Sequence, residues 1–230
     1  MTMNIKTISR YEDFIQALQA TGFCLGGENA HGVFTLNSFF DQGIEYHTGD
    51  AEHDPWAWRM RVLTEEKDIA YAKLFFGLGG YVTREWYPRF LAVRRAGCNL
   101  EEAYREGHIG RLEHEIYCAL RPAGRASVLE LKTMLSLSKS DSSRFERAVT
   151  ALQQKMFVTI CGEKQKLSKS GQPYGWPVTV LCPVEDFFEE EVFAEASRLN
   201  PEQAYQSIYA QIKTLNPRVQ ERAAEKFILG

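Results

Sequence analysis

Apolar residues recur at helical spacing in three neighbouring segments in the middle of the chain. The first segment ends at a proline and a glycine, residues 122 and 124, which both interrupt helices. The second begins with Ser127 followed three residues later by Glu130, the pattern of a capping box. Residues 141–155 continue the periodicity in a third segment. The inward-facing positions are Leu112, Ile116, Ala119 and Leu120, then Val128, Leu131 and Leu135, then Phe145, Ala148, Val149, Leu152 and Met156.

Two runs rich in β-branched and apolar residues follow the third helix. Residues 157–161 and 178–182 have the composition of strands, and the polar residues between them predict a loop that turns the chain back. We expect Tyr174 and Trp176 to anchor the base of this loop. Helices followed by an antiparallel hairpin are the element order of a winged helix-turn-helix, so we predict such a domain over residues 109–183 in a chain of the α+β class.

The N-terminal segment, residues 1–108, predicts an α/β region. Residues 56–62 alternate between apolar and polar in the manner of a strand, and residues 69–76 form a second strand-like run. The glycines at 77, 79 and 80 then predict a tight turn into a helix capped by Thr83. A glycine loop before a helix can also bind an anion, but the spacing matches neither common nucleotide-binding pattern.

The C-terminal segment, residues 184–230, predicts helices alone. Asn200-Pro201 and Asn216-Pro217 each place an N-cap residue before a proline at the first helical position. We expect these helices to pack back onto the N-terminal region or to form a dimer seam, because a homodimer would suit the reading of paired half-sites.

Charge supports a nucleic-acid partner for residues 109–183. This segment carries 11 Lys+Arg against 6 Asp+Glu, whereas each flanking segment is net −4. A basic centre between acidic flanks suits a double-stranded DNA-binding module within a larger protein. We expect the polar face of the 141–155 helix to carry no acidic obstacle and to enter a major groove, while the loop lysines contact phosphates. The predicted groove residues are Ser143, Arg144, Arg147, Thr150 and Gln154, and the predicted phosphate-binding residues are Lys164, Lys166 and Lys169.

Composition excludes several classes of protein. Hydrophobic residues make up 44% of the chain, which is too many for a disordered protein, and no apolar run is long enough to span a bilayer. The five cysteines are scattered without close Cys/His pairing, so we expect reduced thiols in a cytoplasmic protein, with Cys118, Cys161 and Cys182 packed in apolar surroundings. The histidines near residue 50 follow no ligand spacing, so we expect no metal and no cofactor.

Arginines form a second basic group in the N-terminal half. Arg59, Arg61, Arg84, Arg89, Arg94 and Arg95 could extend a nucleic-acid surface, with neighbouring tryptophans as stacking partners. We favour the alternative, in which the aromatic side chains are buried and the arginines pair with acidic neighbours.

Three motifs carry a resemblance to a known family. They are Asp-Pro-Trp-Ala-Trp-Arg at residues 54–59, Tyr-Ala-Lys-Leu-Phe-Phe-Gly at 71–77, and Glu-Trp-Tyr-Pro at 85–88. Together they resemble bacterial proteins related to the AlkZ DNA glycosylases, which are built from winged-helix units. Enzymes of the AlkZ type use a Gln-x-Gln or Gln-x-Asp motif to position a water for attack on the glycosidic bond, and no such triplet occurs here. The resemblance therefore implies DNA binding more strongly than catalysis.

Three hypotheses follow. The first is a winged-helix protein that binds duplex DNA, as a transcription regulator or a DNA-repair accessory. The second is a divergent glycosylase that acts on alkylated bases, with water activated by a carboxylate such as Asp54, Asp68 or Glu85. The third is a winged helix that docks proteins without binding DNA.

Overall fold

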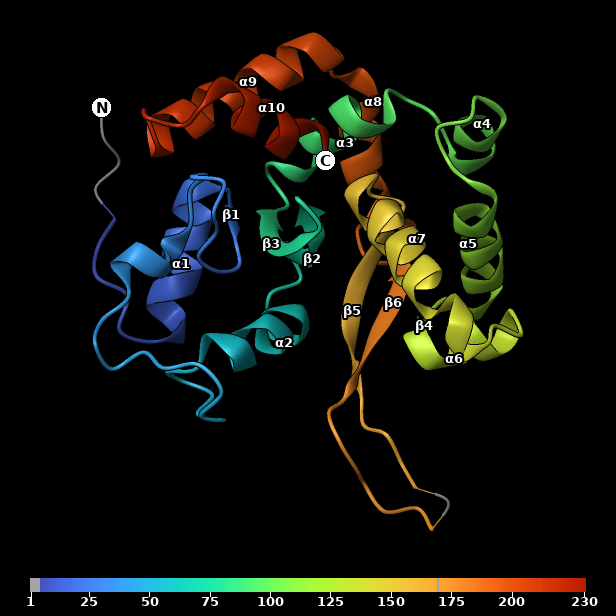
Figure 1. Cartoon of the computed structure of the whole chain (residues 1–230). Coiled ribbons are helices and arrows are strands. Elements are labelled where there is room, and N and C mark those ends of the chain that lie inside the picture. Colours follow the sequence, from blue (N-terminus) through green and yellow to red (C-terminus); the bar gives the residue numbers. More distant parts are fainter. Residues whose placement is uncertain (1–4, 169) are drawn as a thin grey trace. The chain divides into compact units, whose positions relative to one another are not determined.

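The computed structural model describes residues 5–168 and 170–230, which divide into two compact units. The discontinuous unit comprises residues up to Gly97 together with Glu190–Gly230, and the central unit comprises Cys98–Glu189. Each unit has one small antiparallel sheet with helices packed around it (Figure 1). Within the described ranges, no helix is both long enough and apolar enough to cross a membrane.

The sheet of the discontinuous unit has the strand order β1-β3-β2. Its strands are β1 (Phe23–Leu25), β2 (Ile69–Phe75) and β3 (Leu78–Thr83), and β2 confirms the strand expected near residues 69–76. The helices are α1 (Tyr11–Thr21), the short 3-10 helix η1 (Leu36–Phe39), α2 (Pro55–Glu65), α3 (Tyr87–Arg95), α8 (Glu190–Arg198), α9 (Pro201–Leu215) and α10 (Glu221–Leu229).

The strand predicted at residues 56–62 is wrong, because this segment lies within helix α2. The Asp54 carboxylate accepts a hydrogen bond from the Trp56 N–H at 2.7 Å, and Pro55 occupies the first helical turn. Trp58 and Val62, four residues apart, are both fully buried on one face. Over so few residues, the apolar pattern fits both the strand period of two and the helical period of 3.6. The N-cap Asp54 followed by Pro55 favours the helix.

The glycines after β2 do not lead into a helix capped by Thr83, so that prediction is also wrong. Gly79 and Gly80 lie inside β3, and the next helix begins at Tyr87. A β-carbon at Gly80 would collide with the Phe75 ring, and one at Gly79 would collide with the Tyr71 side chain. Glycine is therefore used here because large side chains of the paired strand cover the backbone.

Helices α8, α9 and α10 pack against α3 and complete the discontinuous unit. Phe227 of α10 stacks on Phe75 of β2, with ring centroids 3.7 Å apart. The Arg94 guanidinium donates to the carbonyl oxygens of Leu74, Phe227 and Ile228 at 2.7–2.9 Å. Arg94 therefore joins β2, α3 and α10.

Two of the other arginines pair with carboxylates. Arg61 forms ion pairs with Glu65 at 2.9 Å and Glu52 at 2.7 Å, and Arg84 pairs with Glu195 at 2.9 Å. The expectation of pairing with acidic neighbours such as Glu65 is confirmed for Arg61, whereas the partner of Arg84, Glu195, lies on α8 far along the chain and was not predicted. Arg94 departs from it, because backbone carbonyls take the place of carboxylates.

The central unit has the strand order β4-β6-β5. Its helix α5 contacts α6, α7 and strand β6, so one apolar core lies between the helices and the sheet. The elements are α4 (Leu100–Arg105), α5 (Arg111–Ala123), β4 (Ala126–Ser127), α6 (Val128–Met134), the 3-10 helix η2 (Lys139–Asp141), α7 (Ser142–Gln154), β5 (Val158–Lys164), β6 (Val178–Pro183) and the 3-10 helix η3 (Val184–Asp186).

Candidate nucleic-acid interface

Helix α7 separates an apolar face from a polar one. On the apolar face Phe145, Ala148, Val149 and Leu152 are buried, whereas the opposite side is open to solvent. The open side forms a shallow hollow of about 480 Å³. Four of the predicted groove residues line this hollow, and the fifth, Arg144, is exposed on the same helix. The lining residues are Ser143, Glu146, Arg147, Thr150 and Gln154.

Glu146 corrects the expectation that this face carries no acidic residue. It lies three residues after Ser143 and one before Arg147, so helical spacing places it in the same row. Its carboxylate is 3.8 Å from the Lys132 ammonium, which offsets part of its charge. The polar face therefore carries two arginines, one carboxylate and several neutral hydrogen-bonding groups.

Lys164, at the end of β5, is held by the start of helix α6. Its ammonium lies 2.6 Å from Glu130, whose other carboxylate oxygen accepts hydrogen bonds from the Ser127 N–H and hydroxyl. The Glu130 N–H donates back to the Ser127 hydroxyl, which confirms the predicted capping box. The Lys164 ammonium and the Ser127 donors together lower the pKa of Glu130 to about 2.

Replacing Glu130 with glutamine is expected to reduce stability by roughly 0.5–1 kcal/mol at pH 7, because it removes a solvent-exposed charged bond. The folded pKa, about 2, lies below the ordinary value of 4.5. This contribution is therefore present above pH 4.5 and is lost as the pH falls toward 2. Urea unfolding of both proteins across this range measures the difference. A difference that stays constant down to pH 2 would contradict the assignment.

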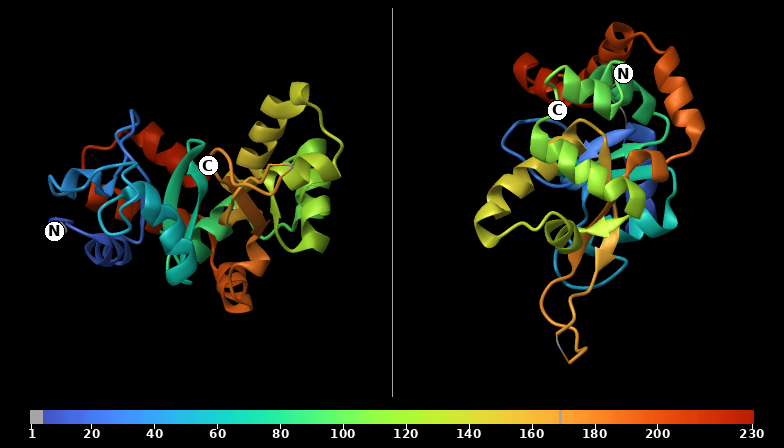
Figure 2. Two further views of the ribbon diagram at one scale, coloured as in Figure 1. Left: turned by 90° about the horizontal axis from the view of Figure 1, so that it is seen from below. Right: turned by 90° about the vertical axis from the view of Figure 1, so that its right-hand side faces the viewer.

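The loop between β5 and β6 continues the hairpin as a long arm that extends beyond the sheet (Figures 1 and 2). The Tyr174 N–H donates to the Lys166 carbonyl at 3.0 Å, and the Ser168 N–H donates to the Gln172 carbonyl at 2.8 Å. The Gln165 amide also donates to the carbonyl of Tyr174 at 3.1 Å. Cross-strand bonds therefore order the arm.

The hairpin carries two of the three predicted phosphate-binding lysines within the described residues. Lys164 is exposed at the end of β5, and Lys166 is half-buried at the start of the loop. Lys169 lies outside the described residues.

Large apolar side chains on the arm are exposed to solvent. The exposed fraction is 67% for Trp176, 54% for Tyr174 and 61% for Leu167. We expected Tyr174 and Trp176 to anchor the base of the loop, but both side chains are more than half exposed. Exposed aromatic rings next to lysines are typical of protein surfaces that bind single-stranded nucleic acid or unstacked bases. Both aromatic residues lie in a stretch rich in Gly, Ser and Lys that has no periodic pattern of apolar residues. This feature of the sequence indicates that their side chains are exposed.

Asp54 has a structural role that removes it from the candidate bases. It is 1% exposed and accepts hydrogen bonds from the backbone N–H groups of His47, Gly49 and Trp56. Burial alone would raise its pKa, but the N–H donors outweigh burial and hold the pKa below its ordinary value. A carboxylate held in this way caps α2 and is a poor acceptor of a proton from water.

The surroundings of the cysteines differ in part from expectation. Cys182 is buried and Cys161 is half-buried, but Cys118 is exposed. Cys118 also lies one helical turn from His114 on α5, with the thiol 3.7 Å from Nε2 of the imidazole. The expectation of no close Cys/His pairing is therefore wrong, because a spacing of four residues on a helix brings side chains together.

Comparison with protein families finds one relationship for the chain. A family model described as "AlkZ related" matches residues 8–229, a span that includes both units and the hairpin arm. Comparison with the curated proteins and with the solved structures finds no match.

Proposed function

Because the chain belongs to the AlkZ-related family, we propose that it binds duplex DNA through a winged helix-turn-helix formed by its central unit. Membership of this family associates the chain with DNA repair and with DNA as a partner. The role proposed for the chain is that of a DNA-repair accessory or a regulator.

The order and pairing of elements support the winged-helix assignment. Helices α5, α6 and α7 precede the β5–β6 hairpin, and β4, between α5 and α6, adds the third antiparallel strand. This is the arrangement in which the last helix enters a major groove and the hairpin forms the wing. In this assignment α7 is the recognition helix and the arm at residues 165–177 is the wing.

One observation carries the proposal: the open face of α7 and an ordered cationic arm belong to the same compact unit. Arg144 and Arg147 on α7, and Lys164 and Lys166 on the hairpin, supply four positive charges to the proposed surface, which the carboxylates of Glu130 (paired with Lys164) and Glu146 offset in part. The guanidinium groups can contact guanine edges or phosphates, while the lysines contact phosphates. Trp176 adds a ring that can stack on a base or sugar.

Arg147→Ala is expected to weaken binding to a preferred duplex by roughly 1–3 kcal/mol, which is about 5- to 150-fold, if Arg147 contacts a base edge. The matched control is Arg105→Ala, which removes an exposed arginine of the central unit outside the proposed surface. Fluorescence anisotropy with a labelled duplex measures both variants. Equal binding by Arg147→Ala and the unmodified protein would reject the groove assignment.

Lys166→Gln is expected to weaken binding to all duplexes about equally and to reduce the slope of affinity against salt by about one. Lys67→Gln, at an exposed position in the discontinuous unit, serves as the charge-matched control. A Lys166 variant with an unchanged salt slope would remove this lysine from the phosphate contacts.

Base excision is a second candidate function, favoured by membership of the AlkZ-related family. It requires a water-activating group, and Asp54 is committed to its cap. Incubation with alkylated duplex followed by detection of abasic sites tests this function. Release above a heat-denatured control would establish an enzyme, and release at the control level would leave DNA binding as the function. A docking module without DNA affinity would bind no duplex even at low salt.

A further inference from the structure

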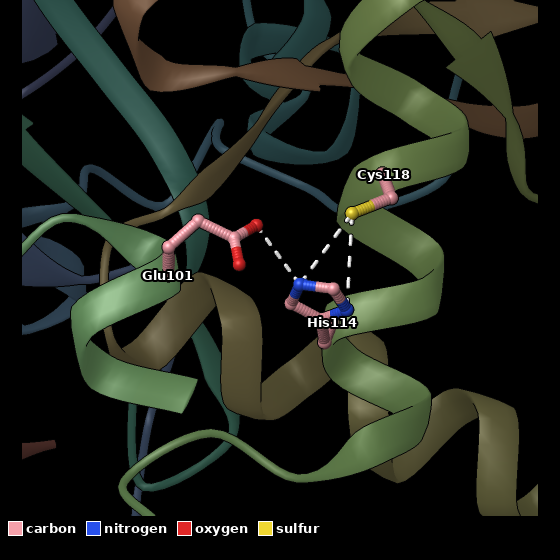
Figure 3. A group of neighbouring side chains, drawn as sticks. All are labelled: Glu101, His114 and Cys118. Carbon is pink, nitrogen blue, oxygen red and sulfur yellow. Dashed lines mark hydrogen bonds and ion pairs between the residues drawn. The ribbon is translucent and has the colours of Figure 1, made fainter. Parts of the chain in front are cut away.

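A second group of chemically active side chains lies in the central unit, on helices α4 and α5. Glu101 projects from α4 toward His114 and Cys118, which lie one turn apart on α5 (Figure 3). The Glu101 carboxylate is 2.9 Å from Nε2 of His114, and the Cys118 thiol is 3.7 Å from the same nitrogen. One ligand atom from each residue lies within 4.8 Å of the other two.

These distances approach those required around a single cation. In tetrahedral coordination with bonds of about 2.0–2.3 Å, neighbouring ligand atoms lie about 3.3–3.8 Å apart. The distance of 3.7 Å from sulfur to Nε2 fits this range, and because the thiol is also 3.8 Å from Nδ1, a rotation of the Cys118 side chain is needed to bring the sulfur toward a cation on Nε2. The oxygen–nitrogen distance of 2.9 Å is shorter, and the exposed Glu101 side chain can rotate to lengthen it. The Tyr104 ring stacks on the imidazole at 4.3 Å and restrains the orientation of His114.

We propose that Glu101, His114 and Cys118 bind one zinc ion, with a water molecule in the fourth position. A thiolate, an imidazole and a carboxylate together suit a borderline cation such as zinc better than magnesium or calcium, which prefer oxygen ligands alone. Cys118 and Glu101 are exposed, so solvent reaches the remaining coordination position. This proposal is independent of DNA binding.

A divalent cation bound by these three residues would join α4 to α5 directly. Zinc is therefore expected to raise the thermal unfolding midpoint of the full chain.

Titration of the metal-free full-length protein with cobalt(II) tests the site, because cobalt replaces zinc and gives a thiolate-to-metal absorption band. We expect the band to saturate at one equivalent and to be removed by an excess of zinc. Cys118→Ser is expected to abolish the band, and His114→Ala is expected to weaken cobalt binding at least 10-fold. The matched control is Cys98→Ser, which removes the thiol nearest in sequence to this group and should leave the band unchanged.

Circular dichroism of each variant shows whether it remains folded, and Glu101→Gln provides a further ligand variant at an exposed position. Retention of the band in folded Cys118→Ser, or its loss in folded Cys98→Ser, would overturn the assignment. The absence of any band in the unmodified protein would overturn it as well. Should Cys118→Ser fail to fold, one equivalent of zinc bound by the unmodified protein and weaker binding by Glu101→Gln would still support the site. No zinc uptake by the unmodified protein would reject it.

Discussion

Replacing Arg94 with alanine is expected to lower the free energy of unfolding by roughly 3–5 kcal/mol, because several charge-assisted hydrogen bonds are lost together. The guanidinium joins the carbonyl oxygens of Leu74, Phe227 and Ile228. It also lies over the rings of Phe75 and Phe90, at 5.4 and 5.2 Å from their centroids. Burial lowers the pKa of Arg94 to about 9, which keeps the group charged at pH 7. Truncation would leave carbonyl groups without this donor inside the packed helices.

Two variants separate this role from a general effect of charge. Arg94→Lys retains the charge but cannot present a planar fork of donors to three carbonyl groups, so we expect an intermediate loss of stability. Arg89→Ala, five residues earlier on α3, removes an arginine that donates to the Glu85 carbonyl and lies over the Trp86 ring, and it should cost less than about 1 kcal/mol. Urea unfolding measures all three. A loss for Arg94→Ala no larger than that for Arg89→Ala would contradict the packing role.

Replacing both Tyr174 and Trp176 with alanine is expected to weaken DNA binding by roughly 1–3 kcal/mol for each ring that stacks on a base, which is about 5- to 150-fold per ring. The two side chains are exposed on the arm, so their removal creates no cavity in the core. The salt slope should change little, because neither residue carries charge.

Trp56→Ala is the matched control for this loss. Trp56 is 39% exposed and lies on α2 of the discontinuous unit, so it is not one of the residues of the proposed surface. Its replacement should leave DNA affinity unchanged. Thermal unfolding of the arm variant should match that of the unmodified protein. Unchanged affinity in the Tyr174/Trp176 variant would show that the arm acts through its lysines alone.

The sequence predicts helices α5, α6 and α7 and strands β5 and β6 well, because local signals and burial agree there, but it predicts neither α4 nor β4. The capping box at Ser127 and Glu130 is present in the structure, and the apolar stripe through Phe145 and Leu152 is buried. The hairpin follows from two β-branched runs on either side of a polar loop. Each of these features depends on neighbours close in the chain, which is why sequence patterns reveal them.

The failures arise where one short pattern suits two structures. Residues 56–62 alternate over too few positions to separate a helix from a strand, and the cap at Asp54 decides the outcome. The glycines before Thr83 are typical of a turn in the sequence. In the structure they are needed because aromatic rings of β2 cover the backbone of β3, and a local pattern does not show that contact. Tryptophan is a residue type that is usually buried, yet Trp176 on the arm is 67% exposed.

The sequence predicts much of the candidate DNA-binding surface but little of the proposed cation site. The stripe of Ser143, Arg147, Thr150 and Gln154 follows from helical spacing alone, although the same spacing also includes Glu146. Glu101 meets His114 only because α4 packs against α5. The spacing of residues along the chain does not predict that contact.

Titration of the full-length protein with duplex DNA at several salt concentrations between about 50 and 200 mM tests the central claim most directly. With four cations on the proposed surface, we expect the logarithm of the association constant to fall linearly with the logarithm of salt, with a slope of about −3 to −4. Binding should be strongest at the lowest salt. The absence of binding at low salt, or a slope near zero, would contradict the account.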